Sequence, residues 1–378
     1  MSLPGPEHRP PHRDHLGSLL LAYSTDWTKE LLDYERGMVP SHRLFGFAEL
    51  REHGYRTDLC RTPRRLGKLL SSPPSWRVFQ ALWALVHQRR YTCIVATTES
   101  PALPLLVLKA AGLIRKPVVV VSVALLHAKN ATGPRRALWA RCIRCADAVI
   151  VYAAEQATAV RQRFRIDGER VVFVPLGVDT AYFSPEDGGE QWESGERFVL
   201  AVGTNEGKDF GTLVRAMPPG VPLLVVTDAS NAEVISLTKP SNPLVTVAHA
   251  VPIRRLRELY RAATVQVIPL HERPYSSGQT VLLENMASGK AVIVSDVSGV
   301  RDYVTPGVTA TVVAPGDVAA LRRAIDEALD VPAARRRIGC AAAAAVRQEY
   351  STQRFAARLS KIIAEVSTPP PRPRQRLR

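Results

Sequence analysis

Small polar residues stand directly before an apolar helical pattern between residues 275 and 304. The first backbone N–H groups of a helix have no partner inside the helix, and the helix dipole makes this end electropositive, so it favours an anion such as a phosphate. Gly278 would let the backbone approach a ligand closely. Glu284 lies about one turn into the helix and could accept two hydroxyl hydrogen bonds, as from a ribose. The segment therefore predicts a site for a phosphate and a ribose. The residues at the predicted helix start are Ser276, Ser277, Gly278, Gln279, Thr280 and Val281.

Short apolar runs alternate with longer helical patterns along the chain. Apolar runs without polar alternation are typical of strands buried on both faces of a parallel sheet, and intervening helices build βαβ units. The expected strands of the first half are 18–24, 55–60, 91–97, 117–123, 147–152 and 171–175, with helices at 42–53, 76–89, 101–113, 134–145 and 154–164. The expected strands of the second half are 197–203, 222–228, 244–249, 265–270, 291–296 and 309–314, with helices at 209–217, 253–262, 280–288, 317–330, 333–347 and 351–365.

These elements predict an α/β fold of two facing, doubly wound Rossmann-like domains with a deep cleft between them. Ligands of such sheets bind outside the carboxyl ends of the strands, so the cleft is the expected site. The expected divisions are a domain at 16–180, a linker at 181–196, a nucleotide-binding domain at 197–350 and a terminal helix at 351–366 that could cross back to the first domain. Residues 1–15 and 367–378 are rich in Pro and polar residues, which predicts disorder.

The segment 275–304 resembles the retaining GT-B glycosyltransferases, specifically the family often called GT4. Its hallmark is two glutamates separated by seven residues and followed by an Ala-Met-Ala-x-Gly-like segment. Here Glu284 stands as the second glutamate, residues 285–289 form the following segment, and Ser276 stands where the first glutamate would be. In the family the first glutamate contacts the donor sugar and the second holds the nucleotide ribose. The departure at Ser276 bears on sugar identity more than on nucleotide binding.

The resemblance extends to residues 201–217, which look like a strand, loop and helix that hold the donor diphosphate in the family. In the family, a Gly, a basic residue and a Lys hold this diphosphate. Gly203 and Lys208 match, whereas Thr204 occupies the usual Arg position. Residues 174–185 resemble the segment that closes the first domain, and residues 251–270 resemble the helix and strand beside the nucleobase pocket. The resemblance covers most of 171–365 well and the first domain loosely.

Two places in the first half have weaker counterparts in the family. The loop between Asp26 and Ser41 contains Gly37, and relatives use a glycine-containing loop here near the donor and the acceptor. His127 follows the predicted strand 117–123, and many relatives place a His there to contact the donor sugar. An ordinary structural role is equally open for both residues.

The resemblance implies transfer of a sugar from a nucleotide-sugar, with UDP, GDP or dTDP as the nucleotide, to an acceptor hydroxyl with retention of anomeric configuration. Lys208, with the N–H groups near Gln279 and Thr280, would stabilise the leaving diphosphate, where negative charge develops. His127, Lys208 and Glu284 are thus the expected catalytic residues. No Asp-x-Asp pair marks a metal site, so neither a metal nor a permanently bound cofactor is expected.

The chain is basic, with 50 Lys and Arg against 35 Asp and Glu, and a net charge of +15. The first 180 residues carry +11 of this charge. Residues 61–90 hold seven cations and no acid, with Trp76, Phe79, Trp83 and Val86 at helical spacing. Such a stretch could dock on an anionic membrane surface, or it could be a helix packed on the sheet with cations at its solvated end.

Other classes are less consistent with the sequence. Five cysteines with one CxxC spacing give no zinc set, and a reduced, cytoplasmic protein is expected. A peripheral position on the inner face of the membrane is left open. No apolar stretch reaches about 20 residues, the first residues lack a signal-peptide core, and no nucleic-acid-binding module is recognisable. Two alternatives stay open: a GT-B epimerase or hydrolase acting on sugar nucleotides, and a non-catalytic GT-B subunit, which Ser276 and Thr204 motivate. The acceptor is unknown.

Overall fold

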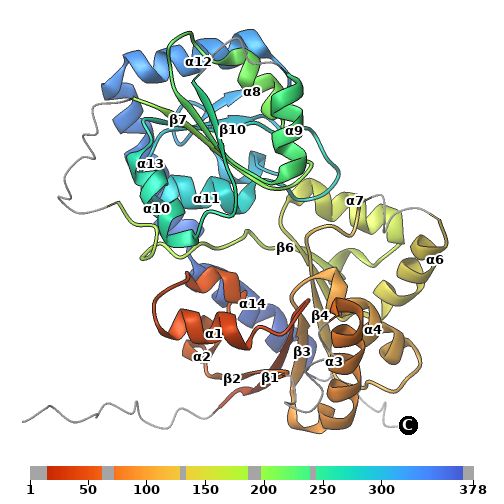
Figure 1. Ribbon diagram of the computed structural model, residues 1–378. Helices are drawn as coiled ribbons and strands as arrows, with labels where there is room; N and C mark the ends of the chain where they lie inside the picture. Colours follow the sequence, from red (N-terminus) through yellow and green to blue (C-terminus); the bar gives the residue numbers. More distant parts are fainter. Residues whose placement is uncertain (1–14, 62–71, 128–132, 186–196, 239–243, 369–378) are drawn as a thin grey trace, which may run out of the picture.

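The computed structural model describes residues 15–61, 72–127, 133–185, 197–238 and 244–368. Within them, two parallel six-stranded sheets lie in separate lobes (Figure 1), with strand orders β2-β1-β3-β4-β5-β6 and β12-β11-β10-β7-β8-β9. The first sheet contains β1 (Gly17–Ala22), β2 (Tyr55–Leu59), β3 (Cys93–Ala96), β4 (Val118–Ser122), β5 (Ala148–Val151) and β6 (Val171–Phe173). The second contains β7 (Val199–Val202), β8 (Leu223–Val226), β9 (Val245–Ala248), β10 (Val265–Ile268), β11 (Val292–Ser295) and β12 (Thr311–Val313).

The helices on these sheets follow the expected alternation. In the first half they are α1 (Thr28–Glu35), α2 (Glu49–Glu52), α3 (Pro73–His87), α4 (Glu99–Ala110), α6 (Gly133–Cys142) and α7 (Ala154–Phe164). In the second half they are α8 (Phe210–Ala216), α9 (Ala229–Leu237), α10 (Ile253–Ala262), α11 (Gln279–Ala287), α12 (Val318–Asp330), α13 (Pro332–Glu349) and α14 (Thr352–Ser367). The two doubly wound α/β domains predicted from the sequence are confirmed, and each of the twelve expected strands forms.

One predicted helix was wrong, and two helices were not predicted. The helix expected at 42–53 is instead a short 3-10 turn (Ser41–Leu44) followed by α2. Phe45 between them has φ 52°, and this left-handed backbone interrupts the helix. Helices α1 and α9 were missed because each buries little: Leu31 is the buried residue of α1, and α9 buries Asn231 and Ile235. Such helices lack the apolar stripe on which a sequence prediction depends.

The last helix joins the two lobes. α14 packs beside α2 of the first domain, although it follows the second domain in the chain (Figure 1). The chain just before it runs alongside Val178, which donates to the carbonyl of Tyr350 at 2.8 Å and accepts from the amide of Thr352 at 3.0 Å. Tyr303 adds a second connection, because its buried hydroxyl donates to the carbonyl of Tyr152 at 2.6 Å. These contacts fix the two sheets relative to each other.

The order of the second sheet locates a ligand site. The chain moves from β7 outward to β8 and β9, and then returns to add β10 on the other side of β7. The loops that follow β7 and β10 therefore diverge at their carboxyl ends and leave a crevice, which is where ligands of doubly wound sheets bind. These are the loops that contain Lys208 and the start of α11.

Candidate functional site

The loop after β7 folds back so that Lys208 lies over Gly203. Gly203 has φ 153°, and a Cβ at this position would overlap the Lys208 side chain. Lys208 is only 6% exposed, and burial lowers the pKa of its ammonium group from 10.5 to about 8. Among the described residues the ammonium has no hydrogen-bond or ion-pair partner. The site therefore holds a buried cation without a counter-ion.

The loops after β7 and β10 are joined by several contacts. Lys208 and Leu270 form an antiparallel bridge, and the amide of His271 donates to the carbonyl of Gly207 at 2.9 Å. The Ser277 hydroxyl donates to Asn205 Oδ1 at 3.3 Å, which connects the start of α11 to the Lys208 loop. The structure thus brings the Lys208 loop and the start of α11 together at one place.

The start of α11 is shaped by Gly278, the residue before its first turn. Gly278 has φ 91°, and a Cβ there would lie 2.8 Å from the Leu270 side chain. Gln279 is buried and its side chain donates to the carbonyl of Gly299 at 2.6 Å, whereas Thr280 is exposed. The Gln279 side chain thus holds the loop after β11 by this hydrogen bond, so only the backbone of Gln279 is available to bind a ligand. Thr204 is exposed in the opposite loop.

Glu284 is already bonded on both oxygens. Oε2 accepts from the Tyr260 hydroxyl at 2.8 Å, and Oε1 lies 3.2 Å from Nε2 of His42. Nδ1 of His42 accepts from the backbone amide of Asp179 at 3.2 Å, so Nε2 carries the proton that faces Glu284. Burial and the Glu284 charge raise the pKa of Tyr260 well above its ordinary value. A ribose at Glu284 would have to displace or share one of these partners.

His42 and Tyr260 were missed in the sequence, although signals for both were present. His42 directly follows Ser41, which ends the loop that contains Gly37, and Tyr260 lies in the helix expected beside the nucleobase. Gly37 itself is exposed, has φ 68° and would have no atom within 4 Å of a Cβ. Within the described residues, no hydrogen bond joins Gly37 to Lys208 or Glu284.

Ser276 also faces a protein partner. Its hydroxyl donates to Oε1 of Gln156 at 2.6 Å, and its amide donates to the carbonyl of Val123 at 3.2 Å. Both partners belong to the first domain, and Ser276 is 6% exposed. Ser276 thus connects the two domains at this point in the cleft.

A second bond across the cleft involves His127. Its Nε2 lies 2.7 Å from Oε1 of Glu206, and the Tyr275 hydroxyl donates to the same oxygen at 3.1 Å. These two hydrogen bonds lower the pKa of the Glu206 carboxyl, and the bond from His127 has the larger effect. The imidazole lies beside the Tyr275 ring, with centroids 5.1 Å apart. His127 is therefore at the cleft, where the sequence placed it, but it is paired with a residue of the Lys208 loop.

A cavity of about 350 Å³ opens between the domains next to Ser276. The start of α7 forms one wall, including Gln156, and the loops after β10 and β11 form the other, including Tyr275 and Ser298. Glu272 is at this wall and accepts from the Ser298 hydroxyl at 2.6 Å. The hydrogen-bonding groups on both walls, such as those of Gln156 and Ser298, suit a hydroxylated ligand. Within the described ranges no cluster of three or more His, Cys, Asp or Glu could hold a metal ion.

Comparisons with known proteins agree with this geometry. Residues 42–182 match the family described as Glycosyltransferase Family 4, and residues 197–330 match Glycosyl transferases group 1. Alpha-maltose-1-phosphate synthase of Mycobacterium tuberculosis is 33% identical over 132 residues, 33% of this chain and 33% of that protein. D-inositol 3-phosphate glycosyltransferase of Segniliparus rotundus is 29% identical over 188 residues, 44% of this chain and 41% of that protein. The chain thus matches less than half the length of these two curated relatives.

Solved structures show the same fold. Sucrose-phosphate synthase of Thermosynechococcus elongatus superposes with a TM-score of 0.70 at 20% identity, covering 93% of this chain and 99% of that one. HepE of Anabaena, crystallised in complex with UDP-glucose, superposes with a TM-score of 0.67 at 17% identity, covering 92% and 99%. The chain therefore carries a Glycosyltransferase Family 4 domain followed by a Glycosyl transferases group 1 domain, arranged in the GT-B fold.

Proposed function

We propose that the protein transfers a sugar from a nucleotide-sugar donor to an acceptor hydroxyl, with retention of anomeric configuration. The observation that carries the proposal is the buried Lys208 side chain, which has no counter-ion among the described residues and belongs to a loop bonded to the start of α11. Removing a cation from water without pairing it is unfavourable, and the lowered pKa of Lys208 reflects that cost. A diphosphate in the crevice would supply the missing charge.

The remaining donor-binding residues have defined tasks in this proposal. The backbone N–H groups of Gln279 and Thr280 bind the phosphates together with Lys208, while Gly203 and Gly278 leave room for them. Glu284 holds the ribose hydroxyls after His42 gives up its bond. The other residues assigned to the donor site are Thr204, Ser276, Ser277 and Val281, and we infer a UDP-, GDP- or dTDP-sugar as the donor.

The chemical step requires charge to be stabilised at the leaving group. As the bond between the anomeric carbon and the diphosphate breaks, negative charge grows on the phosphate oxygen, where Lys208 and the helix start can act. The acceptor oxygen forms the new bond to the anomeric carbon and its proton leaves with the nucleotide diphosphate or solvent. We assign no protein nucleophile and no metal to this step.

Donor binding would rearrange the cleft. His127 is proposed to contact the donor sugar, yet it is bonded to Glu206 in this structure, and Glu284 is bonded to His42. Both bonds connect the two domains, so a donor that reached either residue would have to break the bond there. An opening and reclosing of the domains would admit the donor and then exclude water, which otherwise hydrolyses it.

The second candidate is a non-catalytic GT-B subunit. It is favoured by Ser276 at the position of a family glutamate, since the Ser276 hydroxyl is bonded to Gln156 rather than free for a sugar. An epimerase or hydrolase acting on sugar nucleotides is a third possibility that shares the fold. The three candidates predict different products from the same substrates.

One experiment distinguishes the three candidates. The purified full chain is incubated with a panel of UDP-, GDP- and dTDP-sugars, with and without simple sugar and inositol acceptors. Transfer with release of nucleotide diphosphate supports the proposal, and the configuration of the product is read by NMR coupling constants. Donor hydrolysis alone, or epimerised donor, would favour the third candidate. A chain that neither consumes nor binds any donor would favour the non-catalytic subunit.

A further inference from the structure

Helix α3 has apolar side chains on two of its faces. Its buried face includes Trp76 and Ala84, which pack into the first domain, whereas Val78, Leu82 and Val86 are 53%, 50% and 75% exposed. The exposed residues are four positions apart, so they form one stripe along the helix. Of the aromatic residues expected at the surface, Trp76 is 2% exposed, and Phe79 and Trp83 are half-buried. The exposed apolar surface is therefore aliphatic rather than aromatic.

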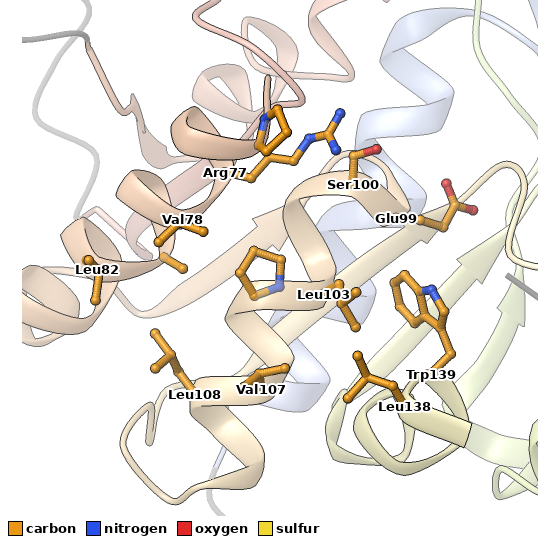
Figure 2. Close-up of a pocket in the computed structure, with 13 residues that line it drawn as sticks. Arg77, Val78, Leu82, Glu99, Ser100, Leu103, Val107, Leu108, Leu138 and Trp139 are labelled. Atoms are coloured by element: carbon orange, nitrogen blue, oxygen red, sulfur yellow. The ribbon is translucent and has the colours of Figure 1, made fainter. Parts of the chain in front are cut away.

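A pocket of about 480 Å³ lies beside this stripe, between α3, α4 and α6. Figure 2 shows Val78 and Leu82 on one side of it, Leu103 and Val107 along its floor, and Leu138 with Trp139 on the opposite side. Val107 and Leu138 are 41% and 42% exposed. A group of adjacent exposed apolar side chains beside a pocket is more often an interaction site than an ordinary part of the solvent-facing surface.

The pocket has one polar end. Arg77, Glu99 and Ser100 lie there, near the starts of α3 and α4 (Figure 2). The Arg77 Nε atom is buried and has no hydrogen-bond partner among the described residues. Arg77 itself lines the pocket, and a guanidinium pairs well with the oxygens of a phosphate. Because α4 begins at the carboxyl end of β3, this polar end lies toward the cleft side of the domain.

The charge around the pocket is strongly one-sided. Residues 73–145 contain eleven Lys and Arg and one acid, Glu99. Glu99 is buried and accepts hydrogen bonds from the Ser122 hydroxyl and the Ala124 amide, so it does not offset the cations at the surface. The exposed cations of this region are Arg89, Arg90, Arg115, Arg136, Arg141 and Arg144. A surface that combines exposed aliphatic side chains with excess cations is complementary to anionic lipid.

We propose that the face formed by α3, α4 and α6 binds the surface of an anionic bilayer, with one lipid acyl chain in the pocket and its phosphate at Arg77. No helix of the described residues is long and apolar enough to span a membrane, so the attachment would be peripheral. The proposal does not depend on transferase activity, because it concerns a separate surface. It would place lipid headgroups beside the cleft.

The first experiment measures flotation of the full chain with vesicles of phosphatidylcholine alone and of phosphatidylcholine mixed with phosphatidylglycerol. The expected result is binding to the anionic vesicles, little binding to the neutral ones, and loss of binding as salt screens the charges. Absence of binding to anionic vesicles at low salt would overturn the proposal.

A matched pair of double variants tests the aliphatic stripe. Leu82→Glu with Val86→Glu is expected to reduce vesicle binding at least about tenfold, since each change puts a charge where lipid contact is made. The control is Val234→Glu with Leu237→Glu on α9, where the side chains are 49% and 73% exposed. The two pairs start from similar exposure, so both variants should fold. Equal losses in both would contradict the assignment of the surface.

Trp139 reports on the pocket itself. It is 2% exposed and lines the pocket wall, so a brominated acyl chain that enters should quench its fluorescence. The quenched component should disappear in Trp139→Phe while vesicle binding remains. Quenching that is unchanged in Trp139→Phe would overturn the pocket assignment.

Sedimentation of the free chain completes the test, because a dimer that Leu82→Glu dissociates would show that a second copy, and not lipid, covers this face.

Discussion

Each of the two domains has a parallel sheet of six strands, yet their positive charges are distributed in opposite ways. Around the first sheet, cations are many, exposed and accompanied by exposed aliphatic side chains. In the second domain, the cation of the proposed site is Lys208, which is buried beside a helix start and has no counter-ion among the described residues. Phosphate chemistry needs a few positioned groups in a dry site, whereas attraction to an extended anionic surface needs many exposed ones. The net charge of this chain therefore describes the first domain rather than the donor site.

The largest expected effect is the loss of activity in Lys208→Met, which removes the charge and keeps much of the side-chain volume over Gly203. Activity with the best donor should fall by at least about tenfold, equivalent to ~1.4 kcal/mol of transition-state stabilisation. Steady-state transfer assays measure it. Arg323→Met, at an exposed position of α12, is the control and should transfer normally.

The same Lys predicts an unusual dependence of stability on pH. Its pKa is about 8 in the folded chain and 10.5 ordinarily, so the unfolded chain binds more protons between these values. The free energy of unfolding contributed by this residue should therefore rise as pH increases from about 8 to about 10.5. Urea unfolding of wild type and Lys208→Met should differ most near neutral pH, with the Met variant more stable, and converge toward pH 10.5. A constant difference would show that the ammonium is not desolvated.

Glu284→Gln should lower activity by a factor similar to that for Lys208→Met, or slightly smaller. The change keeps the shape but removes the charge that Tyr260 and His42 contact, and it weakens the acceptor of the ribose hydroxyls. We expect about a tenfold loss in kcat/KM, with a normal far-ultraviolet spectrum. Normal activity would mean that Glu284 only joins the two domains. His42→Gln, which spares the carboxylate, separates these roles because it should retain donor binding.

Two glycines with left-handed backbone should respond differently to alanine. Gly37→Ala meets open space, so only the backbone strain of ~1–2 kcal/mol applies, and donor binding should stay unchanged. Gly278→Ala adds a clash with Leu270 at the helix start and should also weaken donor binding. Chemical unfolding and donor titration measure the two effects. An acceptor-dependent loss in Gly37→Ala would instead support the loop after β1 as an acceptor site.

The smallest expected effect tests the comparison between domains directly. Reversing Arg89 and Arg90 to Glu should change the donor dissociation constant by less than about twofold. Both side chains are exposed and lie between the end of α3 and the start of β3, whereas the cleft is at the carboxyl ends of the strands. The same variant should lose binding to anionic vesicles. A large loss of donor affinity would show that the basic surface of the first domain steers or binds the donor.

The sequence was informative where local rules decide the structure. Unbroken apolar runs such as the one in β4 predicted both parallel sheets, and the small polar residues before an apolar helical pattern predicted the start of α11. It was less informative where distant segments meet. The bonds from His42 to Glu284 and from Gln156 to Ser276 join residues far apart in the chain, and a single sequence contains no pattern that pairs them. The exposed stripe of α3 was hidden for a related reason: apolar residues on both faces do not reveal which face the sheet will cover.

The most direct test of the central claim is calorimetric titration of the best nucleotide-sugar into wild type, Lys208→Met and Arg323→Met. We predict binding to wild type and Arg323→Met with the same dissociation constant, and an affinity for Lys208→Met lower by at least about tenfold. Equal affinity in all three proteins would contradict the claim that the buried ammonium of Lys208 holds the donor diphosphate.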